Sequence, residues 1–142
     1  MAKFRDAENR EWTVSITVAT LRRLKQELQT DLMKVLDDDC RLLAEFYDNP
    51  VRLVELLYVI CELQIQQSDV SPEQFAEGFS GDVLMTATGA LIEAIADFFP
   101  NPKQRRILRV THQRISEGVD LLLDRTEQAV NQIDVPGVLL AS

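Results

Sequence analysis

The sequence has little of the material from which catalytic and metal sites are built. It contains one histidine and two cysteines. Cys40 and Cys61 are too few for a disulfide framework and lack metal-ligand spacing, and a buried, reduced thiol is the simplest interpretation of Cys61. On a helix, His112 would have no carboxylate or thiol beside it to activate it. The five glycines are scattered and form no phosphate-binding loop. We therefore expect no catalytic centre, no metal and no cofactor.

Long apolar runs and an excess of positive charge are also missing. No stretch approaches the ~18 apolar residues of a membrane span, and the opening MAKFRDAENR lacks the apolar core of a signal peptide. We expect no membrane partner and a cytoplasmic location. The formal net charge is −8, which repels phosphate backbones, so nucleic acid is not an expected partner. Charge is segregated locally, because residues 72–98 hold no Lys or Arg and residues 99–114 hold no acid.

The length and composition are those of one globular domain. A chain of 142 residues with 46% hydrophobic content can bury a core without metal or disulfide support. We predict a single, mainly α-helical domain over residues 1–142. Its expected parts are a β-hairpin (1–18), a helical core (19–100), a long C-terminal helix (101–134) and a short tail (135–142).

The first part is the one place where the side chains alternate. Residues 3–6 and 12–18 are β-like, with Trp12, Val14 and Ile16 on the face to bury, and Asn9 is a fair turn residue between them. A lone hairpin is marginal in water. We therefore expect it either to pack on the helices or to pair with a second copy of the chain.

The rest of the chain predicts about five to six helices. Asn49-Pro50, Ser71-Pro72 and Asn101-Pro102 each place a capping side chain before a proline, which suits the first position of a helix. Leucines recur at helical spacing over residues 21–35, where one helix and two remain open. The final amphipathic pattern runs for roughly 30 residues, about 45 Å of helix.

Residues 98–106, FFPNPKQRR, are the most unusual surface candidate. One interpretation is two buried aromatics at a helix end followed by a solvated basic turn. The other is a partner site with aromatic anchors and an arginine rim, as interfaces often have; DNA binding by the basic turn comes third. The residues proposed for such a site are Phe75, Phe79, Phe98 and Phe99 as anchors, with Arg105 and Arg106 as the rim.

Several short words occur in an order that resembles a known family. They are REW at 10–12, RRLK at 22–25, DNP at 48–50, SPEQFAEGFSGD at 71–82 and FFP at 98–100. Over about residues 4–100 this layout resembles the tail assembly chaperones of long-tailed bacteriophages. That family has no functional motif that transfers residue by residue, so no site residue is assigned from it.

The resemblance implies a non-enzymatic role in the host cytoplasm. Such chaperones bind the long, helical tape measure protein, keep it soluble and help recruit tail tube subunits around it. An alternative is a structural virion subunit, such as a head–tail connector or neck component. A small helical enzyme or ligand-binding domain is the third hypothesis. The hairpin and the long helix also offer two routes to a homo-oligomer.

Overall fold

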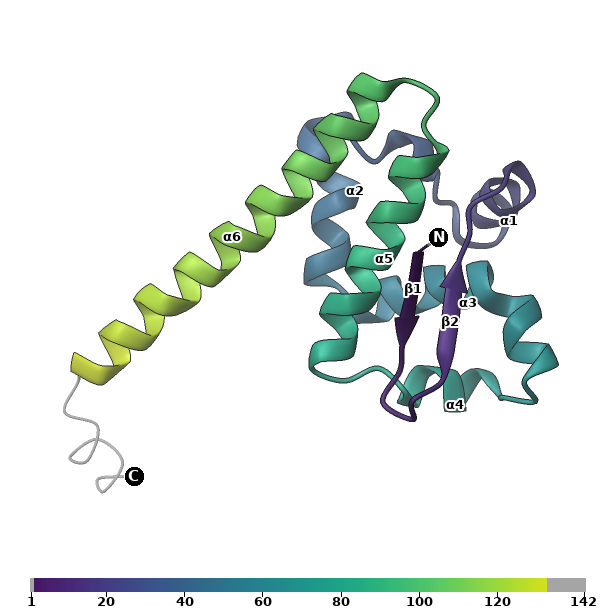
Figure 1. Ribbon diagram of the computed structural model, residues 1–142, viewed down its shortest axis with the longest axis horizontal. Helices are drawn as coiled ribbons and strands as arrows, with labels where there is room; N and C mark the ends of the chain where they lie inside the picture. Colours follow the sequence, from purple (N-terminus) through teal and green to yellow (C-terminus); the bar gives the residue numbers. More distant parts are fainter. Residues whose placement is uncertain (1, 133–142) are drawn as a thin grey trace. The chain divides into compact units, whose positions relative to one another are not determined.

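The computed structural model describes residues 2–132 and is mainly helical, with 75% of the chain in helices (Figure 1). This confirms the predicted class: six α-helices, a two-stranded antiparallel hairpin at the N-terminus and a long last helix. The predicted tail, 135–142, lies outside the described residues. Within them, no helix combines the length and apolar character needed to cross a membrane.

The hairpin consists of β1 (Ala2–Arg5) and β2 (Glu11–Val14), with Phe4 paired to Trp12. Asn9 has a φ of 62° in the connecting loop, as its turn role predicts. The second strand is shorter than the predicted run 12–18. The reason is that the side chain of Thr17 accepts a hydrogen bond from the Thr20 backbone N–H and so starts a helix there.

Both edges of the hairpin are covered by other parts of the chain. The side-chain amide of Gln64 bonds the N–H and the C=O of Thr13, at 2.9 and 2.7 Å, as a neighbouring strand would. On the other side, β1 packs against α5 (Asp82–Phe98), where Ala87 and Ala90 are buried and small enough to allow close approach (Figure 1). The hairpin therefore caps the helical core, one of the two predicted roles.

The segment 21–35 contains one α-helix followed by a single turn. The helix α1 (Val18–Leu28) ends at Gln29, whose φ is 51°, and a 3₁₀ turn η1 (Leu32–Lys34) follows, capped by Asp31. Next comes α2 (Asp37–Asp48). Asp38, Asp39 and Cys40 near its start all have positive φ, so the first turn of α2 departs from regular helical geometry.

Helix starts at proline are confirmed in all three places. The helices are α3 (Pro50–Gln67), α4 (Pro72–Glu77) and α6 (Pro102–Gln132), and Ser71 and Gln74 form a reciprocal capping box. Helix α3 is central, since most of its apolar side chains are buried. The core between α3, α4 and the hairpin is aromatic: Phe75 lies edge-on to Trp12, with ring centroids 5.2 Å apart.

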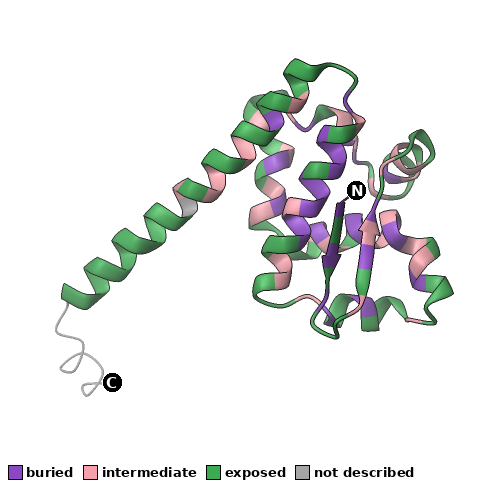
Figure 2. Ribbon diagram, in the orientation of Figure 1, coloured by how far each residue is buried: buried purple, intermediate pink, exposed green. Residues whose placement is uncertain are grey.

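The chain divides into two compact units, Met1–Arg109 and Val110–Ser142. The first unit contains the hairpin, the helical core and the start of α6. The described part of the second unit is the remainder of α6. Nearly every core side chain lies in the first unit, as the buried residues in Figure 2 show.

Candidate partner-binding site

A groove lined by apolar side chains together with Ser15 and Asp97 lies in the first unit, where the end of the hairpin meets the end of α5. Its volume is about 370 Å³, within the range of ordinary binding cavities. The residues that line it are Ala2, Val14, Ser15, Ile16, Ala94, Asp97 and Phe98. Val14 and Ala94 are buried, whereas Ile16 and Phe98 are half-buried. Ile16 and Phe98 are the apolar side chains of the groove that a partner can reach, beside the exposed Ser15 and Asp97.

Local sequence rules place both of these side chains. The helix α5 stops at Phe98, and Phe99 takes an extended conformation with ψ of 125° because Pro100 follows. Ile16 follows the strand β2 and precedes the Thr17 cap, so it belongs to neither a strand nor a helix. The groove therefore forms where the strand β2 and the helix α5 end.

The one charged wall of the groove, Asp97, is paired within the chain. Arg109 donates hydrogen bonds to Glu93 and to Asp97, each at 2.8 Å. The hydrogen bond to Glu93 and the charge of that carboxylate raise the pKa of Arg109, and Asp97 adds to the effect. A ligand with apolar side chains fits this surface better than an ionic one.

The structure places the six predicted site residues in different surroundings. Phe75 and Phe99 are 0% and 2% exposed, so both are core residues and offer no surface to a partner. Phe79 is half-buried and its ring lies 5.1 Å from Phe75 and 5.5 Å from Phe4. Phe98 is the predicted anchor that lines the groove.

The two predicted rim arginines also differ. The Nε of Arg105 donates to the carbonyl oxygen of Phe99 at 2.6 Å, so this side chain holds the α5–α6 turn together. Arg106 is exposed, and its side chain makes no hydrogen bond or ion pair with any other described residue. The predicted aromatic cluster with an arginine rim is therefore not assembled as one patch. Ile16 and Ala94 were not predicted as site residues, because an apolar side chain at either position is expected to be buried in the core.

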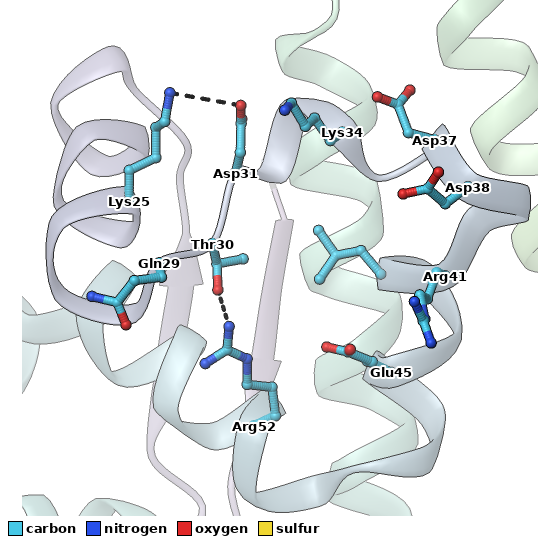
Figure 3. A pocket seen from close by; sticks show the side chains of 11 residues that line it. Lys25, Gln29, Thr30, Asp31, Lys34, Asp37, Asp38, Arg41, Glu45 and Arg52 are labelled. Carbon is cyan, nitrogen blue, oxygen red and sulfur yellow. Dashed lines mark hydrogen bonds and ion pairs between the residues drawn. The ribbon is translucent and has the colours of Figure 1, made fainter.

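A larger and more polar pocket of about 500 Å³ lies between α1, η1, α2 and α3 (Figure 3). Its lining residues are Lys25, Gln29, Thr30, Asp31, Lys34, Asp37, Asp38, Arg41, Leu42, Glu45 and Arg52. Several of its charges are used within the chain: Lys25 pairs with Asp31 at 3.8 Å, and Arg52 donates to Thr30 and to the Leu28 carbonyl oxygen. With both signs of charge and no histidine or cysteine in the lining, it selects no ligand class.

No arrangement for thiol or metal chemistry is found in residues 2–132. Burial raises the pKa of the Cys61 thiol to about 12, which keeps it protonated and inert. Among these residues, no group of three or more His, Cys, Asp and Glu side chains is placed to hold a metal ion.

Comparison with known proteins gave no assignment: no family model matches the chain, and no curated protein or solved structure is significantly similar to it.

Proposed function

We propose that this protein is a bacteriophage tail assembly chaperone, which acts in the host cytoplasm through protein–protein contacts and without catalysis. Its proposed partner is the tape measure protein, and through that complex the tail tube protein. The family layout of the sequence motivates the identity. The observation that carries a binding role is the groove beside Phe98, where Phe98 and Ile16 present apolar surface and the Asp97 carboxylate is paired with Arg109.

The chemistry of the groove matches the chemistry of the proposed partner. A tape measure protein is a long chain of amphipathic helices, and such helices dock by placing apolar side chains into a hydrophobic groove. A groove of about 370 Å³ accepts only a few side chains at a time. The protein would therefore bind short apolar segments repeated along the partner, with several copies on one partner chain. The net charge of −8 would keep such a complex soluble.

The test is co-expression with the longest helix-rich protein encoded beside this one, followed by tagged pull-down. We expect the partner to be insoluble alone and soluble in the complex. Changing Phe98→Ser together with Ile16→Ser should lower recovery of the partner at least tenfold. Leu63→Ser is the matched control, because Leu63 is 71% exposed on α3, away from the groove residues.

Two outcomes would contradict the proposal. If the partner is soluble to the same extent with and without this protein, there is no chaperone activity. If the protein is present at a fixed copy number in purified virions, the structural subunit, such as a connector or neck component, replaces the chaperone. Circular dichroism of the groove variants must show unchanged helix content for the pull-down to count.

A further inference from the structure

The charges of α6 are divided between its two halves. Lys103, Arg105, Arg106, Arg109 and Arg114 lie in the first half, in which there is no acid. Glu117, Asp120, Asp124 and Glu127 lie in the second half, where Arg125 is the one basic residue. The side chains of Lys103, Arg106, Arg114 and Asp124 make no hydrogen bond or ion pair with any other described residue. Much of this charge is therefore uncompensated within the described chain.

One face of α6 combines these charges with exposed apolar side chains. Residues 103, 107, 110, 114, 117, 121, 124 and 128 recur at alternating intervals of four and three, the repeat that keeps one side of a helix facing a partner helix. On this face Ile107 is 49%, Val110 40% and Leu121 52% exposed. Leu108, by contrast, is 0% exposed. The repeat defines one side of the helix, which we call the outer face of α6.

The two halves of the outer face complement each other but cannot meet within one helix. Arg106 and Asp124 are separated by eighteen positions, roughly 27 Å along a helix axis. Two copies of α6 running in opposite directions bring them together. When residue 110 of one copy lies opposite residue 121 of the other, Val110 faces Leu121 and Arg114 faces Glu117. In the same register Ile107 lies opposite Asp124, and Arg106, which borders the outer face, lies next to that carboxylate. Each contact occurs twice, as a two-fold axis requires.

We infer that the outer face of α6 is a self-association surface, on which two copies of this chain pair their last helices antiparallel. A parallel pair would place Arg114 opposite Arg114 and Glu117 opposite Glu117, which is repulsive. The antiparallel register pairs unlike charges at positions 114 and 117 and apolar side chains at positions 110 and 121. The contact is a single pair of helices, so we expect a weak dimer that depends on concentration and on salt. This inference does not rest on the proposed function.

Exchanging the charges tests the pairing. One variant of the full chain carries Arg106→Glu with Arg114→Glu, and a second carries Glu117→Lys with Asp124→Lys. By sedimentation velocity, each variant alone should dimerise at least tenfold more weakly than the wild type, and an equal mixture should form a heterodimer. The control is Asp120→Lys with Glu127→Lys, which has the same charge change off the outer face and should weaken the dimer less than threefold.

Cysteine pairing tests the direction. In the antiparallel register, a Val110→Cys protein mixed with a Leu121→Cys protein forms a mixed disulfide faster than either forms one with itself. Preferential self-linking of Val110→Cys would overturn the antiparallel arrangement. A wild-type protein that stays monomeric at millimolar concentration and low salt would overturn the self-association surface altogether. A dimer whose association constant is unchanged by the charge exchanges would also overturn the self-association surface.

Discussion

The indole N–H of Trp12 donates a hydrogen bond to the carboxylate of Asp6 at 3.0 Å, inside the core of the first unit. The carboxylate has no exposed surface, and it also accepts hydrogen bonds from the Arg10 side chain at 2.8 Å and the Arg10 backbone N–H at 2.9 Å. The backbone N–H of Glu8 donates to it as well, at 3.0 Å. One buried acid thus holds the hairpin loop, the hairpin and the aromatic core in register.

Replacing Asp6 by Asn should therefore be costly. The amide cannot accept all four hydrogen bonds, and its NH₂ group would face other donors in a buried site. We expect the free energy of unfolding to fall by about 2–4 kcal/mol, the usual range for breaking a buried charged network. Urea unfolding measures this change in the free energy of unfolding. Glu8→Gln is the control, because that side chain is exposed, and it should change stability by less than about 0.5 kcal/mol.

The same acid predicts a pH dependence. Burial acts to raise the pKa of Asp6, but the hydrogen bonds from Trp12 and Arg10 and the charge of Arg10 outweigh it, so the pKa lies below its ordinary value. A lowered pKa in the folded state stabilises the protein above the unfolded pKa of about 3.9. This stabilisation is lost as pH falls below that value toward the folded pKa. Unfolding free energies measured from pH 6 to pH 2 should show the loss in the wild type and a smaller slope in Asp6→Asn. Equal slopes would contradict the assignment.

Gly78 is predicted to tolerate no side chain. A Cβ atom at this position would lie 2.9 Å from an Asp6 carboxylate oxygen, and Asp6 is held in place by four donors. We expect Gly78→Ala to lower the unfolding free energy by about 1–3 kcal/mol, as overpacking does. Gly118→Ala is the matched control, since nothing lies within 4 Å of its added Cβ. That change should be neutral or stabilise by up to about 1 kcal/mol, because alanine favours a helix interior.

Gln64 is predicted to protect the edge of β2. Without its amide, the N–H of Thr13 loses its partner and the C=O keeps only the weak S–H donor of Cys61 at 3.7 Å, so Gln64→Ala should cost about 1–2 kcal/mol. Amide hydrogen exchange should show faster exchange at Thr13, with protection in α3 unchanged. Gln66→Ala is the control, because Gln66 is exposed and its side chain bonds only to Glu62 among the described residues. Equal exchange at Thr13 in both variants would mean that Gln64 does not cover the edge.

The features predicted best from the sequence are those that neighbouring residues decide. The proline helix starts and the Ser71 capping box need only a few adjacent residues, and alternation over 12–16 was enough to identify the hairpin. Contacts between distant residues were not predictable in this way. Nothing near Gln64 in the sequence shows that its amide would complete a strand edge, and nothing near Asp6 indicates burial against Trp12 and Gly78.

The candidate site was harder to predict for the same reason. Phe98 and Phe99 are adjacent and chemically identical, yet one lines the groove and the other is in the core. Which side chain faces outward depends on the helix end at Pro100 and on what α5 packs against. The consecutive positive φ values at Asp38, Asp39 and Cys40 were also not predicted. Aspartate tolerates that region through local hydrogen bonds, but nothing in the structure explains it for Cys40.

The most direct test of the account is photocrosslinking from the groove. A benzoylphenylalanine placed at Phe98 keeps an aromatic side chain there, and the same group placed at Leu63 serves as the control on α3. During co-expression with the tape measure protein, we predict a crosslink to that protein from position 98 and none from position 63. Equal crosslinking from both positions, or none from position 98 while the complex forms, would contradict the assignment of the groove as the partner site.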